Sequence, residues 1–282
     1  MPARSRAARR KGVAMKLWYQ SMTREGDAWG AYPRTLRAIL DKVKEPDTEI
    51  EVHGITDVGG AGDQFRYLEF LETGEVLRNV HTAMERGFDA FLIGNIGDPG
   101  IREAREFASI PVLGLCESSL HLACMMGANF SLVTINDKFT PRIVENVERY
   151  GLRSKMAAVN RMRVERLMDL GKAYEDAEAR ARLFAQFNEA AAANEAAGAE
   201  VVIAAGGVVM ALLAAHEVHA TPRGTLILNG ITALVKMGEM AVRLARVMGG
   251  RFASRTLSYA PPPGDQIAEL RKFYGPGIYP GV

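Results

Sequence analysis

Two apolar segments that each end in small residues constrain the fold of this chain most strongly. Residues 91–100 read FLIGNIGDPG, and residues 201–208 read VVIAAGGV. An apolar run that ends at glycine predicts a buried parallel strand followed by a turn where the backbone can approach a ligand. Because open α/β sheets bind ligands beyond the carboxyl ends of their strands, the two strand ends predict two similar halves that face one cleft.

The first half of the chain alternates predicted strands and helices. We expect strands over residues 16–22, 49–55, 89–94 and 111–115, and helices over residues 32–43, 101–108 and 118–126, with one more long helix that ends at Arg86 after the glycine-rich loop 58–62. The helices are indicated by apolar residues that recur every three or four positions. This alternation predicts a parallel sheet with right-handed crossovers.

The second half restarts the same pattern. We expect strands over residues 129–135, 155–159, 200–205 and 225–228, and helices from Thr140, over residues 164–197 and over residues 231–248. Pro141 suits the first turn of a helix, because its missing N–H has no helical partner there.

The predicted fold class is therefore α/β, with two pseudo-symmetric half-domains, each a mainly parallel sheet flanked by helices, and an active-site cleft between them. The expected parts are a flexible basic tail (1–14), a first half-domain (15–117) joined by a C-terminal helix (231–260), a second half-domain (118–230) and a surface tail (261–282).

Composition and charge exclude several partner classes. The chain has 282 residues, of which 48% are hydrophobic and 24% charged, as expected for a globular protein. Its net charge of +2 comes from a basic start, so the folded body is close to neutral and does not suit a nucleic-acid surface. No run reaches the roughly 20 apolar residues of a membrane span. A small-molecule substrate and a homo-oligomer are the expected partners.

The location is expected to be cytoplasmic. The basic start is not followed by an apolar stretch of signal-peptide length, which favours a flexible tail or an upstream start codon. Cys116 and Cys124 lie in one strand-to-helix segment and would face different ways, so we expect no disulfide. Two free thiols fit a reducing compartment.

Two segments of the chain resemble a known family. IGNIGDPGIREAREF at residues 93–107 and IPVLGLCESSLHLACMMGANFSLVTIND at residues 110–137 are similar to the aspartate/glutamate/hydantoin racemase superfamily, most of all to its hydantoin racemase branch. The resemblance covers roughly residues 16–250. It implies a racemase without a cofactor, in which each half offers one cysteine to opposite faces of the substrate carbon. Those cysteines would fall at Asn95 and Gly206, and neither is cysteine.

This difference limits the mechanism that can be carried over. Racemisation without a cofactor needs a base on one face of a weakly acidic carbon and an acid on the other. A thiol can do this because its pKa of about 8.5 can be lowered by a site, whereas an amide or a bare glycine cannot. We therefore do not expect the two-thiol mechanism in this chain.

Seven residues are candidates for substrate binding. Asn95 and the backbone at Gly206 and Gly207 can donate hydrogen bonds to a carboxylate or an enolate oxygen. The resemblance places Thr134 and Asn136 in an oxygen-binding region, and it places Gln20 and Ser21 where relatives grip a carboxylate. For all of these, turn capping or a glycine backbone requirement is the structural alternative.

Three residues are candidates for proton transfer. Cys116 follows a predicted strand and precedes a helix, whose positive end would favour a thiolate, and Glu117 comes next. His53 ends the second strand and has a side chain that titrates near neutrality. Cys124 is expected in the core, and His216 and His219 lack the spacing of a metal site, so no metal is expected.

Three functions stay open at this point. One is a racemase or isomerase with substitute acid and base groups, the second is a decarboxylase, lyase or hydrolase with one-sided chemistry, and the third is a binding protein without catalysis. Because the candidate strand ends carry no arginine, a cyclic amide or lightly charged carboxylate fits better than a dicarboxylate.

Overall fold

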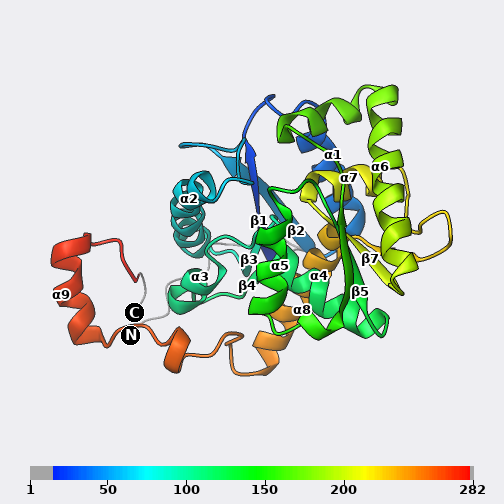
Figure 1. Ribbon diagram of the computed structural model, residues 1–282. Coiled ribbons are helices and arrows are strands. Elements are labelled where there is room, and N and C mark those ends of the chain that lie inside the picture. The colour runs from blue at the N-terminus through cyan, green and yellow to red at the C-terminus, as the bar shows by residue number, and fades with distance from the viewer. Residues whose placement is uncertain (1–14, 280–282) are drawn as a thin grey trace.

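Two four-stranded parallel sheets form the two halves of the protein (Figure 1). The computed structural model describes residues 15–279, so the basic tail predicted over residues 1–14 lies outside the described residues. The first sheet has the order β2-β1-β3-β4 and the second has the order β6-β5-β7-β8. Since the two orders are equivalent, β3 corresponds to β7 and β1 to β5, and the predicted pseudo-symmetric α/β fold is confirmed.

The first half contains eight regular elements: β1 (Met15–Arg24), α1 (Tyr32–Val43), β2 (Thr48–Ile55), α2 (Arg66–Glu85), β3 (Ala90–Ile93), α3 (Ile101–Phe107), β4 (Val112–Gly114) and α4 (Leu115–Met126). The second half contains β5 (Phe130–Thr134), α5 (Thr140–Arg149), β6 (Met156–Arg161), α6 (Ala177–Ala196), β7 (Val201–Ala205), α7 (Gly207–Ala215), β8 (Leu226–Leu228) and α8 (Gly230–Val247). Short 3-10 helices lie at Arg153–Lys155, Leu167–Tyr174 and Leu257–Tyr259, and α9 (Gly264–Tyr274) follows.

The central strands β3 and β7 are buried along their whole length. Their continuous apolar sequences, AFLI and VVIAA, suit strands that are covered on both faces by helices. The carboxyl ends of both strands point toward the boundary between the two halves, so the turns that follow them line the same cavity.

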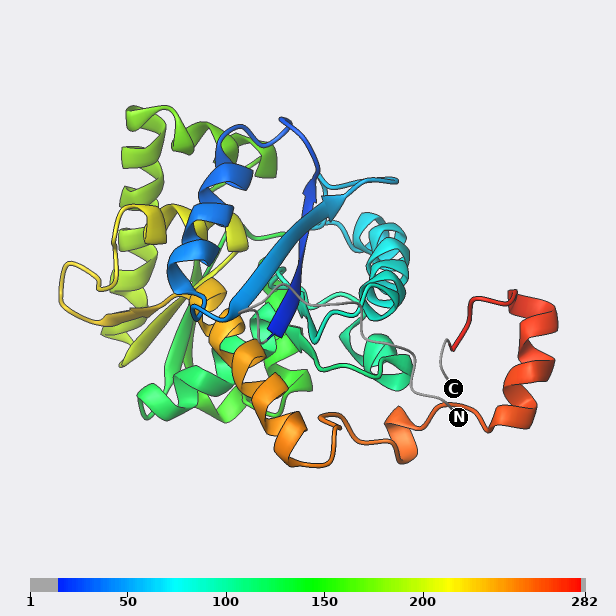
Figure 2. The ribbon, with the colours of Figure 1, turned by 180° about the vertical axis from the view of Figure 1, so that it is seen from behind.

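Helices α1, α4, α7 and α8 join the two halves into one core. Helix α8 packs against α4 and also contacts β3, β4 and α1, while α1 packs against α7. Figure 2 shows α8, in orange, running beside α1, in blue. The largest apolar cluster therefore extends through both halves, and a smaller one lies between the first sheet and helices α2 and α3.

Three predicted element boundaries are wrong. Strand β4 ends at Gly114 and α4 begins at Leu115, so Cys116 lies in a helix rather than at a strand end. The helix predicted over residues 164–197 is divided, because Asp176 caps a new helix by accepting hydrogen bonds from the amides of Glu178 and Ala179.

The third difference concerns the C-terminal segment. Helix α8 ends at Val247, next to the end predicted at residue 248, because Gly249 and Gly250 both adopt positive φ angles that terminate it; it therefore covers only part of the joining segment predicted as a helix over residues 231–260. The predicted surface tail contains the helix α9, which stands away from the body in both views (Figures 1 and 2). Of the helices described between residues 15 and 279, none is long and apolar enough to cross a membrane.

Candidate active site

A small cavity of about 40 Å³ lies where the strand ends of the two halves meet. The first half lines it with Ser21, Met22, Thr23, Trp29, Tyr32, Asp63, Gly94, Asn95 and Ile96, and the second half lines it with Ile135, Phe139, Leu167, Leu170, Gly206, Gly207 and Val208. Asn95 and Gly206 therefore face the same space, as the paired strand ends predict. The volume suffices for a few water molecules and is well below that of a typical ligand site.

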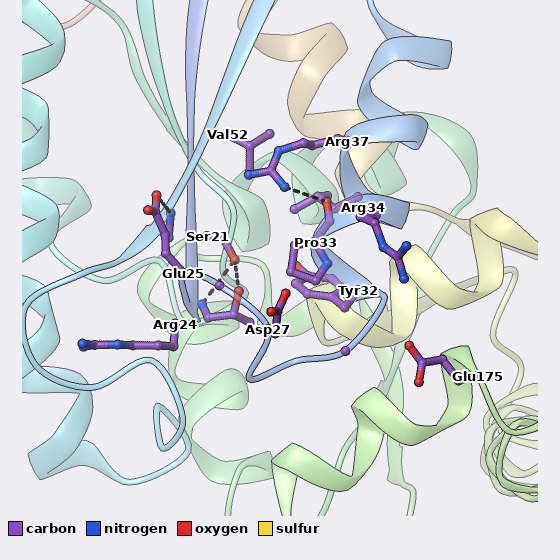
Figure 3. Close-up of a pocket in the computed structure, with 15 residues that line it drawn as sticks. Ser21, Arg24, Glu25, Asp27, Tyr32, Pro33, Arg34, Arg37, Val52 and Glu175 are labelled. Carbon is purple, nitrogen blue, oxygen red and sulfur yellow. Dashed lines mark hydrogen bonds between the residues drawn. The ribbon is translucent and has the colours of Figure 1, made fainter.

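An open pocket of about 600 Å³ adjoins this cavity (Figure 3). The two spaces share Ser21, Thr23 and Tyr32 as lining residues. Both are also lined by the loop between β1 and α1, which carries Trp29 on the cavity side. The outer pocket is bordered by charged side chains of both signs, namely Arg24, Glu25, Asp27, Arg34, Arg37 and Glu175.

The turn after β3 is held by its own asparagine. Asn95 Oδ1 accepts a hydrogen bond from the Gly97 amide at 2.7 Å, and Asn95 Nδ2 donates to Asp63 Oδ2 at 2.5 Å. Asn95 therefore stabilises its own turn, which was the structural alternative, and it also contacts Asp63 inside the cavity. Asn95 links the backbone of the turn to an ionisable group.

Asp63 is the functional candidate that sequence reasoning missed. Its carboxyl group is partly buried in the cavity, and burial raises its pKa to about 6, although the hydrogen bond from Asn95 opposes that rise and the nearby Glu69 adds to it. A carboxyl group with this pKa can accept a proton near neutral pH. Asp63 directly follows the glycine-rich loop 58–62, which comes after the second predicted strand, and this position is the sequence feature that could have identified it as a site residue.

Side chains from α5 of the second half fix the same turn. Arg142 Nη2 and Asn146 Nδ2 donate to the carbonyl oxygen of Gly97 at 2.7 and 2.9 Å. Arg142 also pairs with Glu69 of α2, with Nη2 to Oε1 at 2.6 Å, and both side chains are buried. This buried network ties the Asn95 turn to both halves.

The turn after β7 has a bare backbone. Gly206 and Gly207 lead directly into α7, and within residues 15–279 no side chain caps the start of that helix. The first amides of a helix lack partners within the helix, so those of α7 are available at the cavity. A Cβ atom on Gly206 would lie 2.8 Å from Ile135 Cδ1, and one on Gly207 would lie 3.4 Å from the carbonyl oxygen of Gly94.

Tyr32 is the second ionisable residue in the cavity. It is the first residue of α1, and its side chain is 2% exposed. Burial raises its pKa to about 12, a hydrogen bond with Ser21 opposes the rise, and the nearby Asp63 charge adds to it. Ser21 Oγ also lies 2.8 Å from Thr23 Oγ1, a contact that is drawn as a dashed line at Ser21 in Figure 3.

Gln20, Thr134 and Asn136 lie outside the cavity. Gln20 Nε2 donates to the carbonyl oxygens of Ser21 and Gly54, and its Oε1 accepts from Trp18 and Asn79. Since successive strand residues point to opposite faces, Ser21 reaches the cavity and Gln20 does not.

Both second-half candidates bond to protein groups instead. Thr134 Oγ1 contacts Thr140 Oγ1 in the first turn of α5, and the Thr134 side chain is buried. Asn136 Nδ2 donates to Gln64 Oε1 at 2.9 Å, and its Oδ1 accepts from the amide of Phe139 at 3.0 Å. For Asn136, which accepts from a backbone amide of its turn, this is the capping role that was the structural alternative.

Cys116 and Glu117 also lie outside the cavity. The Cys116 side chain is fully buried in the first turn of α4, and burial, with the Asp98 carboxyl group adding to it, raises the thiol pKa well above its usual value. The prediction that the helix start favours a thiolate at Cys116 is therefore wrong. Asp98 accepts from the amides of Cys116 and Glu117 at 2.9 and 2.8 Å, so the helix start is already occupied, and the Glu117 carboxylate pairs with Arg105.

His53 is held away from the cavity on the face of the first sheet. Its ring stacks on Trp18 with 3.6 Å between ring centroids, and its Nε2 lies 3.4 Å from Glu51 Oε2. Burial lowers its pKa below the usual value despite that carboxylate. In the part of the chain that the structure describes, no group of three or more His, Cys, Asp or Glu residues could hold a metal ion.

Comparison with known proteins gives a consistent result. The profile of the family described as Asp/Glu/Hydantoin racemase matches residues 31–238. The hydantoin racemase of Pseudomonas sp. (strain NS671) is 30% identical over 217 residues, which cover 77% of this chain and 82% of that protein. The hydantoin racemase of Rhizobium meliloti is 30% identical over 226 residues, which cover 78% and 85%.

The fold is also similar to that of a solved structure. Allantoin racemase from Klebsiella pneumoniae superposes with a TM-score of 0.74 at 24% identity, and the match covers 88% of this chain and 94% of that chain.

Proposed function

Since the chain belongs to the Asp/Glu/Hydantoin racemase family and is an enzyme of that superfamily, we propose that it moves a proton at the acidic carbon of a small cyclic amide. The reaction that we propose is an isomerisation that uses no cofactor and takes place in the cavity between the two halves. A carbon flanked by a carbonyl group and an amide nitrogen is acidic enough for removal of its proton by a positioned base.

The observation that carries this proposal is the Asp63 carboxyl group in the cavity. With a pKa raised to about 6, it is ionised at neutral pH yet basic enough to take up a proton. Asn95 Nδ2 fixes its position with a hydrogen bond of 2.5 Å. Asp63 therefore replaces the thiol that the resemblance expects at residue 95.

The lining of the cavity favours a neutral substrate. Within residues 15–279, no arginine or lysine lines this space, whereas an ionised Asp63 would repel a carboxylate. Hydroxyl groups of Ser21 and Thr23 can pair with amide N–H and C=O groups. A hydantoin-like ring meets these conditions, which agrees with the hydantoin and allantoin racemases that the chain is similar to.

The start of α7 offers a place for the developing negative charge. When the proton leaves, charge moves onto a carbonyl oxygen of the ring, and amides at a helix N-terminus stabilise such an oxygen. Gly206 and Gly207 let a ligand approach these amides closely because neither carries a side chain. We assign Gly206 and Gly207 to substrate binding on this ground, together with Ser21 and Asn95.

A substrate ring has to enter through the outer pocket. The cavity of about 40 Å³ is too small for a ring, and the loop between β1 and α1 lines both spaces. Displacement of Trp29, whose Nε1 donates to the Gly60 carbonyl oxygen at 2.8 Å, would join them. A polar ring substituent would then lie among the charges of the outer pocket.

Deuterium exchange tests the proposal. Each enantiomer of 5-isopropylhydantoin and of allantoin is incubated with enzyme in D₂O, and loss of the ring C–H is followed by proton NMR while inversion is followed by circular dichroism. Enzyme-dependent exchange with inversion supports the isomerase. Loss of CO₂ from a malonate, or ring opening, would establish the one-sided decarboxylase or hydrolase instead, and binding without any reaction would establish a binding protein.

We also propose a cytoplasmic homo-oligomer. The two cysteines are free, which suits a reducing compartment. Five apolar residues at the start of α2 are exposed: Phe65, Tyr67, Leu68, Phe70 and Leu71. Such a patch is a common feature of subunit interfaces. Sedimentation velocity of the purified chain would show a monomer if this proposal is wrong.

A further inference from the structure

The turn after β7 brings no side chain to the cavity, yet one ionisable group lies beside that turn. Tyr32 belongs to α1 of the first half, but α1 packs against α7 of the second half. A Cβ atom on Gly207 would lie 3.9 Å from Tyr32 Oη. The phenol therefore lies beside the Gly206 and Gly207 turn, whereas Asp63 is bonded to the Asn95 turn.

We propose that Tyr32 is the second proton-transfer residue of this site and serves the substrate face opposite Asp63. This inference rests on the proposed isomerase. It extends that proposal by supplying a partner for Asp63, which turns a one-sided site into a two-sided one.

The step balances with these two groups alone. The Asp63 carboxylate takes the proton from the ring carbon, and the electron pair of the C–H bond moves into the adjacent carbonyl group to form an enolate. The Tyr32 O–H bond then breaks as its proton forms a new C–H bond on the other face. The products are the opposite enantiomer, a neutral Asp63 and a Tyr32 phenolate, and exchange with water restores both side chains.

The surroundings of Tyr32 keep its hydroxyl group as a proton donor. The ring is fixed edge-on against Tyr174, with 5.8 Å between centroids, and tilted against Trp29 at 6.4 Å. The Asp63 charge opposes ionisation of the phenol, so one group is ionised and the other neutral in the resting enzyme. Ser21, whose hydroxyl group lowers the pKa of the phenol, lines the cavity with Tyr32 and also lines the outer pocket, so it offers a path for proton return from water.

A neighbouring tyrosine provides a matched control. Tyr19 is fully buried beneath Gly94, and its hydroxyl group has no hydrogen-bond partner among the described residues. It does not line the cavity. Tyr19→Phe removes the same atom as Tyr32→Phe without touching the reaction, and removal of an unpaired buried hydroxyl group should not destabilise the protein.

The test measures exchange and inversion separately in Tyr32→Phe and Tyr19→Phe, with both enantiomers of 5-isopropylhydantoin in D₂O. We expect Tyr32→Phe to lose inversion by about 10² to 10⁴-fold, the range of one general acid. Exchange from the enantiomer whose C–H bond faces Asp63 should persist with retained configuration, and exchange from the other enantiomer should disappear. Tyr19→Phe should keep both rates.

The opposite results overturn the inference. If Tyr32→Phe still inverts the substrate, the second proton donor is elsewhere, although the isomerase stands. If exchange falls equally from both enantiomers, Tyr32 stabilises the enolate or orients the ring and does not transfer the proton. If the unmodified enzyme exchanges neither enantiomer of any hydantoin, the proposed function fails and the assignment of Tyr32 fails with it.

Discussion

The turns that follow β3 and β7 occupy equivalent places in two equivalent sheets, but they are built differently. At the first, Asn95 bonds to Gly97 and Asp63, and Arg142 and Asn146 hold the carbonyl oxygen of Gly97. At the second, Gly206 leads straight into α7 without a side-chain cap among the described residues. The first turn places an ionisable group, and the second exposes the amides of a helix start.

This difference shows how a symmetric fold can hold an asymmetric site. The first turn can move a proton through Asp63, whereas the second can only stabilise charge through its backbone. The missing group on the second face comes from α1 in our proposal, because the packing of α1 on α7 brings Tyr32 there. The pseudo-symmetry of the strands therefore does not extend to the chemistry.

The largest effect is expected from removing the base. Asp63→Asn should lower kcat by about 10² to 10⁴-fold with both enantiomers, because one positioned base contributes that much. Initial rates of inversion with each enantiomer measure the loss. Asp41→Asn, which makes the same change on the exposed face of α1, should leave the rate unaltered. A residual activity of Asp63→Asn above a tenth would exclude Asp63 as the base.

A thiol added to the turn after β7 should speed proton transfer on the substrate face that lies opposite Asp63 in our proposal. Gly206→Cys adds a proton donor whose pKa of about 8.5 is closer to neutrality than that of Tyr32, so inversion should rise about tenfold. The new side chain must displace Ile135 Cδ1, which lies 2.8 Å from the position that the added Cβ atom would take, and Ile135→Val can be combined with it to make room.

The control for this gain is Gly206→Ala, which adds the same crowding without a thiol. The comparison is made at pH 7.5 with both enantiomers. If the alanine and cysteine variants change inversion equally, then the second face does not limit the reaction and the contrast between the two turns has no catalytic consequence.

The pH profile should report the first turn. Because Asp63 must be ionised to act and its pKa is raised to about 6, kcat/KM should rise about tenfold between pH 5 and pH 7. The raised pKa also makes the stability of the protein depend on pH. Because the folded state favours the neutral Asp63 carboxyl group, the stabilisation that this group gives is complete below about pH 4 and is lost as the pH rises through about 6.

Chemical denaturation of the unmodified protein and Asp63→Asn at pH 4 and pH 7 isolates that contribution. The variant should gain stability relative to the unmodified protein as pH rises, by at most about 3 kcal/mol. A difference between the two proteins that does not change with pH would show that the Asp63 pKa is not raised.

The smallest effect is expected at Cys116, which lies outside both turns. Cys116→Ala should keep kcat within about twofold and lower the free energy of unfolding by about 1 kcal/mol, because the side chain is buried and not in the cavity. Iodoacetamide at pH 8.5 should modify the partly exposed Cys124 before Cys116 in the folded protein. If Cys116 is modified first and activity is lost with it, the Cys116 thiol would be part of the active site.

Much of the fold follows from the sequence itself. Strands β3 and β7 have apolar runs and glycine-ended turns that identify them without any tertiary information, and their order along the chain predicts the two halves. Asn95 and Gly206 were found as cavity residues for the same reason, since the carboxyl ends of equivalent parallel strands meet at one cleft.

The remaining parts of the site depend on contacts between distant residues. A strand buried on both faces shows no alternation of polar and apolar residues, so the sequence could not tell that Ser21 and not Gln20 enters the cavity. Asp98 occupies the helix start at Cys116 from 18 residues earlier, and burial decides the pKa of that thiol. Asp63 and Tyr32 become functional candidates only when loop and helix packing bring them to the strand ends, because burial and neighbouring charge set the pKa of a side chain and both are properties of the folded chain.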